Sequence, residues 1–480
     1  MQSRRDQVQA HMFVMGRVAA GMYRDDPDAP EPPHRRTSRG MGVGLAIGVL
    51  VALAVTVYGF VVPGGSDGWK KEGTLVLDKQ SGARYLSLDG RLHPVLNQSS
   101  ARLLAGDRLS VKSLSSASIA AAPRGPALGI VGAPDALPAA SRLSRDAWSA
   151  CATRAEPGGD GALLTLGVGL SAGGRPVTAG RAVLVRGGTR HDTYLLWHGT
   201  RSRLDPANGA PAALGYGDTP AFPVPEGFLN ALPPGPDLAT PEVAGRGTQG
   251  PSLAGRPSRV GQLFGDGAGH HLLLRPDGLA PLTPLQYALL KGDPRTQRTA
   301  YAGAAVTEAR VWPDDLARHR APGTAASSPG PGLPDEVPRV MEVAAGEAVC
   351  AVTATGAGGP SVSVVLPQAS AVAGTPPAAG PGLVADARTA DRVALRAGSG
   401  ALVRAVSSSG TGRALYLVTE SGAKYPVADA DSLQQLGYPA ASAVALPAAL
   451  LSMLPTGPAL DAGALRSRGL VQAAAQNGGK

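Results

Sequence analysis

The segment RALYLVTESGAKYPVADADSLQQLGY, residues 413–438, contains the pattern on which the fold prediction rests. An apolar stretch leads to a turn at Ser421-Gly422, and a second stretch containing Pro426 leads to a helical stretch. Glycine in such a turn permits a tight hairpin between two short strands. The segment therefore predicts one ββα unit.

Three other segments share this order of apolar stretch, glycine turn, second stretch and helix. Two strands and one helix bury too little apolar surface to be stable alone, so such units must pack on one another or on a common centre. We therefore expect an α+β fold in which four ββα-type repeats form an elongated domain around a central core. The other three segments are ARYLSLDGRLHPVLNQSSARLLAG (83–106), HDTYLLWHGTRSRLDPANGAPAALGY (191–216) and HHLLLRPDGLAPLTPLQYALLKGD (270–293).

An uncharged stretch, MGVGLAIGVLVALAVTVYGFVV, occupies residues 41–62. At ~1.5 Å per residue a helix of this length crosses the ~30 Å hydrocarbon layer of a bilayer. The stretch is too long for the apolar region of a signal peptide and begins too far from the N-terminus. It predicts a single transmembrane helix.

Basic residues set the expected orientation of this helix. Arg35, Arg36 and Arg39 precede it, and the N-terminal excess of positive charge is larger than that of Lys70 and Lys71 behind it. The positive-inside rule then places residues 1–40 in the cytoplasm and the rest of the chain outside. We expect a cell-membrane protein with an extracytoplasmic C-terminal domain.

Small residues recur at every fourth position of the apolar stretch: Gly40, Gly44, Gly48 and Ala52. This spacing puts them on one helix face, where another helix can approach closely. The alternative is that glycine and alanine are simply common in this chain. Further upstream, Asp6 to Arg24 has apolar residues at helical spacing and predicts an amphipathic helix that lies on lipid or on a partner.

The chain has two cysteines, Cys151 and Cys350, both in the part expected outside the membrane. Two thiols in that compartment predict one disulfide, with two unpaired thiols as the alternative. The bond would close a loop worth about 5 kcal/mol as an upper value in the chain-entropy model. No spacing of cysteine and histidine resembles a zinc site.

Motifs of enzymes are absent or fall in unsuitable places. No G-x-x-x-x-G-K-[ST] phosphate loop occurs, since the one lysine that follows a glycine is Lys480. Residues 64–68 match G-x-S-x-G but directly follow the membrane stretch, and 167–172 mimic a dinucleotide fingerprint without a following helix. His270 and His271 fall on a predicted strand. We expect neither an enzyme nor a cofactor nor a bound metal.

The composition argues against a nucleic-acid partner. The formal net charge is +9, but the arginines that supply it are scattered along the chain instead of clustering with aromatic residues.

These features give the following expected layout: 1–40 cytoplasmic amphipathic helix and linker, 41–62 transmembrane helix, 63–72 linker, 73–115 repeat 1, 116–182 first part of the core, 183–240 repeat 2, 241–298 linker and repeat 3, 299–401 second part of the core with a flexible loop at 321–338, 402–465 repeat 4, and 466–480 tail.

The chain resembles EccB, a membrane component of the type VII (ESX) secretion machinery of actinobacteria. Segments along nearly the whole length carry the resemblance. They are RRDQVQAHMFVMGRVAAGM (4–22), YLSLDGRLHPVLNQSSARLL (85–104), PRGPALGIVGAPDALP (123–138), WSAC (148–151) and VWPDDLARHR (311–320).

The resemblance implies a structural subunit whose exported repeats surround a disulfide-bearing core and form the outer vestibule of the translocation machinery. It implies assembly with an FtsK-like ATPase (EccC), a multi-span protein (EccD), EccE and the protease mycosin, as a homodimer within a larger oligomer. Its repeats resemble cell-wall-binding folds, so a solitary peptidoglycan-binding anchor is the second hypothesis. EccB-like proteins are sometimes labelled ATPases, which makes an ATPase the third.

Overall fold

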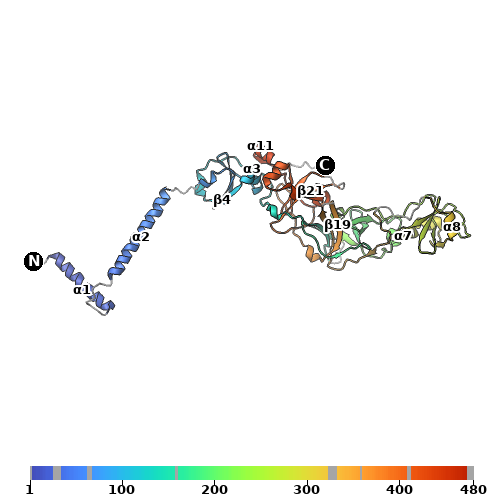
Figure 1. Cartoon of the computed structure of the whole chain (residues 1–480), viewed down its shortest axis with the longest axis horizontal. Coiled ribbons are helices and arrows are strands. Elements are labelled where there is room, and N and C mark those ends of the chain that lie inside the picture. The colour runs from blue at the N-terminus through green and yellow to red at the C-terminus, as the bar shows by residue number, and fades with distance from the viewer. Residues whose placement is uncertain are drawn as a thin grey trace.

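Two N-terminal helices precede an elongated domain of small β-sheets (Figure 1). The computed structural model describes residues 3–24, 34–61, 67–156, 161–322, 332–356, 359–407 and 412–472. The domain is of mixed α+β type, as expected from the sequence.

Helices α1 (Arg4–Arg24) and α2 (His34–Val61) form the N-terminal part. Within α2, residues Thr37–Tyr58 are long and apolar enough to cross a membrane, and nothing in the chain buries them. It is the one such helix in the described part of the chain. The helix begins earlier than the uncharged stretch because helical hydrogen bonds form within the segment and do not require apolar side chains.

Four sheets repeat one strand order. In the first sheet, β1, β2 and β3 form an antiparallel meander, a helix follows, and the fourth strand returns parallel to β1 on the free edge. Its elements are β1 (Thr74–Asp78), β2 (Arg84–Leu88), β3 (Arg91–Pro94), α3 (Gln98–Ala105) and β4 (Ser110–Leu114).

The other three sheets have the orders β11-β10-β9-β12, β15-β14-β13-β16 and β23-β22-β21-β24. The second contains β9 (Arg181–Gly187), β10 (Asp192–Trp197), β11 (Thr200–Arg203), α5 (Ala210–Ala213), β12 (Phe222–Val224) and α6 (Glu226–Ala231), with β17 (Arg339–Val340) added beside β9. The third contains β13 (Leu263–Gly265), β14 (His271–Arg275), β15 (Gly278–Leu282), α7 (Pro284–Gly292), β16 (Ala309–Arg310) and α8 (Pro313–Arg318). The fourth contains β21 (Ala401–Val406), β22 (Leu415–Val418), β23 (Lys424–Val427), α9 (Ala430–Leu436), β24 (Val444–Pro447), α10 (Ala448–Leu451) and α11 (Ala462–Arg468).

The hairpin turns follow from their residues. Asp89 and Gly90 have φ angles of 50° and 68°, and His198 and Gly199 have 49° and 72°. Two consecutive residues with positive φ match the right-handed twist of the flanking strands, and this is the geometry expected of a two-residue hairpin.

A six-stranded sheet forms the centre of the domain, in the order β20-β7-β6-β18-β19-β8. Cys151 on β6 lies directly opposite Cys350 on β18, and their sulfur atoms are bonded, so the disulfide expected from the sequence is present. The strands are β6 (Trp148–Arg154), β7 (Ala162–Gly167), β8 (Arg175–Pro176), β18 (Val349–Gly356), β19 (Gly359–Leu366) and β20 (Arg392–Ala394).

The main core joins this central sheet to the second and fourth sheets. Trp148 is fully buried there, together with Phe222 from β12, Phe228 from α6, and Leu446 from β24. The core is therefore continuous through the middle of the domain.

Helices connect the sheets in pairs. Helix α3 of the first sheet packs on α9 and α11 of the fourth, and α5 of the second packs on α7 of the third. The C-terminal strand β25 (Leu470–Val471) pairs in parallel with β5 (Gly129–Ile130), which follows the first sheet. The order along the long axis is thus first, fourth, centre, second, third sheet (Figure 1).

Several element bounds differ from the expected layout. Strand β9 begins at Arg181, two residues before the expected start of repeat 2, and β16 extends the third sheet to Arg310, well past residue 298. Strand β25 lies in the expected tail. Strands β16 and β25 have two residues each and pair with strands far away in the chain, and such strands leave no periodic pattern. Residues 323–331 of the loop and 473–480 of the tail lie outside the described residues.

Replacing both cysteines, Cys151→Ala with Cys350→Ala, should lower the free energy of unfolding by about 2–5 kcal/mol. The bond removes entropy from the unfolded chain because it joins residues 199 positions apart. Denaturant unfolding of the detergent-solubilised chain without reductant measures the change. Reduced wild-type protein is the control and should unfold at the variant's midpoint. An unchanged midpoint in both would contradict a stabilising role.

Candidate assembly surfaces

The small residues of α2 form an open stripe in the isolated chain. A methyl group built on Gly40, Gly44 or Gly48 would meet nothing within 4 Å. Thr56 continues the stripe, and its hydroxyl donates to the carbonyl oxygen of Ala52 at 2.6 Å, which satisfies it within the helix. The stripe thus has the close-approach surface that a partner helix needs, and its packing role stays a prediction.

The disulfide lies in the interior of the domain. Cys151 and Cys350 are 1% and 0% exposed and pack with Ala348 and Val372. Nearby, Arg175 on β8 forms an ion pair with Glu347 at 2.6 Å, and this guanidinium lowers the pKa of the carboxyl group. The burial of both sulfurs indicates a structural bond instead of a redox-active one.

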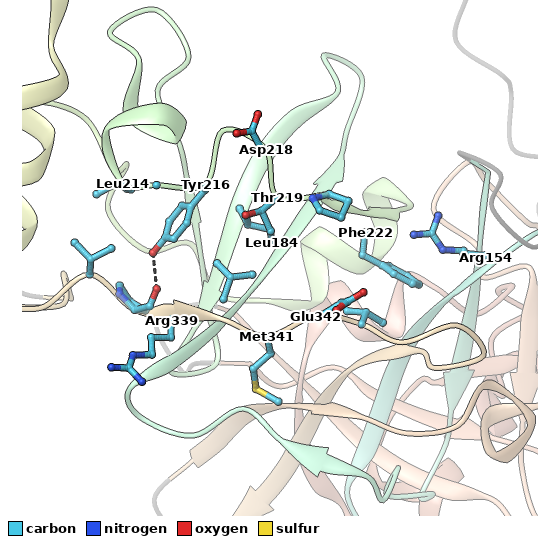
Figure 2. A pocket seen from close by; sticks show the side chains of 16 residues that line it. Arg154, Leu184, Leu214, Tyr216, Asp218, Thr219, Phe222, Arg339, Met341 and Glu342 are labelled. Atoms are coloured by element: carbon cyan, nitrogen blue, oxygen red, sulfur yellow. Dashed lines mark hydrogen bonds between the residues drawn. The ribbon is translucent and has the colours of Figure 1, made fainter.

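A cavity of about 730 Å³ lies between residues 214–222 and 337–343 beside β9 (Figure 2). The Tyr216 hydroxyl donates to the carbonyl oxygen of Pro338 at 2.7 Å, and burial raises the pKa of this phenol. Arg154 stacks 4.8 Å from the centre of the Phe222 ring. The lining contains no serine, cysteine, histidine or lysine, and its polar side chains include those of Tyr216, Asp218, Thr219 and Glu342.

The adjacent histidines are engaged by different partners. His271 Nδ1 is 2.7 Å from Glu308 Oε1 and its ring stacks on Tyr287, whereas His270 Nδ1 is 2.7 Å from Asp266 Oδ2. The contact with His270 lowers the pKa of Asp266 to about 2. In the described ranges of the chain no three His, Cys, Asp or Glu side chains gather as a metal site requires.

Lys424 is a buried cation that the sequence reasoning missed. It is 8% exposed, and its Nζ donates to the carbonyl oxygens of Leu451 at 2.7 Å and Leu454 at 2.5 Å. Burial lowers its pKa to about 8. The ammonium group thereby satisfies carbonyls at the C-terminal end of α10, where a positive charge is favourable. The sequence signal that could have indicated this buried lysine is its position in the otherwise apolar strand KYPV.

Comparison with known proteins identifies the family of this chain. The family described as "Type VII secretion system ESX-1, transport TM domain B" matches residues 1–471. The chain belongs to this EccB family. The resemblance noted in its sequence motifs is therefore confirmed over nearly the whole length.

Curated EccB relatives match across the same range. The chain is 30% identical to "ESX-3 secretion system ATPase EccB3" of Mycolicibacterium smegmatis, over 96% of this chain and 89% of the relative. It is 29% identical to "ESX-5 secretion system ATPase EccB5" of Mycobacterium tuberculosis, over 96% and 92%.

Solved structures of EccB proteins share the fold. A chain of the intact ESX-5 inner membrane complex matches with a TM-score of 0.59 at 26% identity, over 96% of this chain and 94% of that one. The EccB3 dimer from the ESX-3 core complex gives 0.62 at 27%, over 81% and 98%. The periplasmic assembly of the ESX-5 complex gives 0.63 at 27%, over 83% and 96%.

Replacing Lys424 with methionine should change how stability depends on pH. Folding lowers the lysine pKa from its ordinary 10.5 to about 8, so between these values the unfolded chain binds more protons than the folded one. The free energy of unfolding of wild type should therefore rise with pH above 8, by about 2 kcal/mol at pH 9.5 relative to Lys424→Met. Denaturation curves from pH 7 to 9.5 measure this difference.

Lys291→Met is the matched control, because Lys291 is an exposed lysine. It should keep the wild-type pH dependence. Parallel curves for wild type and Lys424→Met would show that the buried ammonium does not titrate in this range.

Proposed function

We propose that this EccB-family chain is a structural membrane subunit of a type VII secretion complex. The observation that carries the proposal is its match, over 96% of its length, to a chain of the intact ESX-5 inner membrane complex. Helix α2, the one helix of membrane-spanning length and apolarity among the described residues, agrees with a subunit of a membrane complex.

In this proposal α2 crosses the membrane once, with residues 1–40 in the cytoplasm and 63–480 outside. The arginines before α2 support this orientation through the positive-inside rule. The buried disulfide also supports it, because such bonds persist in oxidising compartments outside the cytoplasm.

We regard the four similar sheets as copies of one repeat arranged around the disulfide-bearing centre. Besides the shared strand order, each third strand has a parallel bridge to a later segment. Each repeat is larger than the ββα unit expected from the sequence, since it comprises a three-stranded meander, a helix and a fourth strand that pairs in parallel with the first. The bridges are Leu92–Arg124, Arg201–Pro234, Leu279–Arg320 and Lys424–Thr456.

This arrangement suits an outer vestibule. Paired helices between neighbouring sheets and a continuous central core make an elongated body that holds its shape without partners. We propose that copies of this body line the passage outside the membrane, as homodimers within a larger oligomer. The solved ESX-3 relative is itself a dimer.

The proposed partners are an EccC-like FtsK-type ATPase, an EccD-like multi-span protein, EccE and a mycosin protease, without nucleic acid. The curated relatives carry the word ATPase in their names. This chain has no phosphate loop in its sequence, and its large domain would lie where ATP is scarce. We therefore assign ATP hydrolysis to the FtsK-type partner and expect only background turnover from the purified chain.

A solitary wall-binding anchor is the alternative function. The elongated shape would allow the far end of the domain to contact peptidoglycan beyond the membrane (Figure 1). Binding of purified peptidoglycan by the full chain, undiminished in cells that lack secretion partners, would favour this alternative.

Affinity purification of the tagged chain from mildly solubilised native membranes tests the main proposal. Mass spectrometry should recover the FtsK-type ATPase and the multi-span protein with it. A tagged unrelated single-span protein is the control for detergent mixing. Recovery of this chain alone, under conditions that keep other membrane complexes intact, would contradict a subunit role.

Lengthening the small residues of α2, Gly44→Leu with Gly48→Leu, should reduce recovery of the partners by about tenfold. Leucine keeps the helix apolar enough to insert but prevents the close approach of a second helix. Co-purification yield, normalised to membrane-inserted chain, measures the effect.

Gly42→Leu with Ala46→Leu provides a matched control. These small residues lie on the opposite face of α2, and a methyl group on Gly42 also meets nothing within 4 Å. This variant should assemble like wild type. Equal losses in both variants would mean that the Gly40/Gly44/Gly48/Ala52 face has no special role.

A further inference from the structure

The first sheet has an uncovered edge. On β4 the residues Val111, Lys112 and Ser113 are all exposed, although consecutive strand residues point to opposite faces. The corresponding strands β12 and β24 pack against the central sheet and bury Phe222 and Leu446. Strand β4 therefore lacks the cover that its counterparts in the second and fourth sheets receive.

This edge is also where lysines gather. Four of the seven lysines in the chain lie between residues 67 and 115. Lys71 precedes β1 and accepts a backbone hydrogen bond from Thr74, Lys112 is paired with Val76, and the Lys79 amide donates to the carbonyl oxygen of Leu114. Three lysines thus follow one another along the β1–β4 border, and exposed Arg108 lies just before β4.

Nearby acidic side chains form hydrogen bonds or ion pairs with other groups. Asp78 accepts hydrogen bonds from the Ser81 and Ser116 hydroxyls at 2.6 and 2.8 Å. Asp107 lies 3.4 Å from Arg102, and Glu72 accepts from the Asp89 amide. We call Lys71, Lys79, Arg108, Val111 and Lys112 the β4 edge.

A short tether connects the first sheet to helix α2. Helix α2 ends at Val61 and the next helical turn begins at Asp67, so the intervening chain spans at most about 20 Å. Trp69 then packs against the buried cluster that contains Leu114, the last residue of β4. The tether is thus fixed to the same part of the sheet as the β4 edge.

We propose that the β4 edge is a docking surface for anionic lipid headgroups of the bilayer that α2 crosses. Positive charge and one exposed apolar side chain, Val111 at 62%, fit a lipid surface that carries negative headgroups above hydrocarbon. Lysines along an edge strand disfavour pairing with a further strand, so lipid suits this edge better than a second protein chain. Docking would fix the tilt of the domain relative to the membrane. The inference rests on the proposed membrane span of α2.

The test uses the full chain in nanodiscs of phosphatidylcholine alone or with about one third phosphatidylglycerol. Amine-reactive labelling, quantified by mass spectrometry, should fall about threefold or more at Lys71, Lys79 and Lys112 in the anionic discs. The protection should disappear at high salt, which screens such contacts. Exposed Lys291 in α7 is the internal control and should label equally in both discs.

Amide hydrogen exchange, measured in wild type and in a triple variant, extends the test to the backbone. In wild type, amide hydrogen exchange of residues 110–114 should be slower in anionic discs than in neutral ones. Lys71→Gln with Lys79→Gln and Lys112→Gln should abolish this difference. The control, Arg256→Gln with Lys291→Gln and Arg298→Gln, removes three exposed cations from the third-sheet region and should keep it.

Two results would overturn the inference. Equal labelling in both discs at low salt would show no contact with anionic lipid. Equally slow amide exchange of residues 110–114 in both discs would indicate a protein contact on β4. Co-migration of the protein with the discs reports insertion of α2 independently. Failure to insert would therefore reject the membrane span, and normal insertion without protection would reject lipid docking alone.

Discussion

The bond between Cys151 and Cys350 joins the two central strands on which the large C-terminal domain depends. Strands β6 and β18 lie side by side, yet they come from opposite ends of a long stretch of chain. The residues of the second sheet lie between β6 and β18 in the sequence, and its strand β12 packs against β6 and β7. The fourth sheet comes after β18 in the sequence, and its strand β24 packs against β18 and β19. Without the β6–β18 pairing neither sheet would have a surface on which to bury its return strand.

The first and third sheets depend on the central sheet indirectly. They are connected to it through the fourth and second sheets, on which they pack with their helices. Each small sheet with its own helices buries too little apolar surface to be stable alone, so a neighbour's helix must complete its core. Asn97 illustrates the local fit: its side chain accepts from the Ser100 amide at 3.0 Å and donates to the carbonyl oxygen of Ile130, next to β25. The chain end and the first sheet are thus held together.

Features with strong local signals could be predicted from the sequence. The uncharged stretch within α2, the Asp89-Gly90 and His198-Gly199 hairpins, and the pairing of the only two cysteines each follow from a few adjacent residues or from a simple count. The small-residue stripe was found in the same way, and its function stays a prediction.

Features that depend on long-range contacts could not be predicted. Return strands such as Phe222–Val224 are too short to show a period, and their partners lie tens of residues earlier in the chain. The burial of Lys424 could not be read from its own segment, because it results from packing against α10 and the residues after it, whose carbonyl groups accept from the ammonium group. The choice of helix partners, α3 with α9 and α5 with α7, likewise depends on the central sheet and leaves no trace in either segment alone.

The proposed assembly would distribute its binding energy over two surfaces of one chain. The α2 stripe offers a close but small contact within the membrane, and such helix contacts are individually weak. The C-terminal domain follows after a short tether, so a contact made by the helix raises the effective concentration of the domain next to its neighbour's domain. The gain is greatest when the tether is short and the domain keeps its shape, and the disulfide-bonded centre provides that shape. Stability of the core and strength of assembly are therefore linked, because a domain that opened at β6 and β18 would lose the fixed geometry through which the second contact forms.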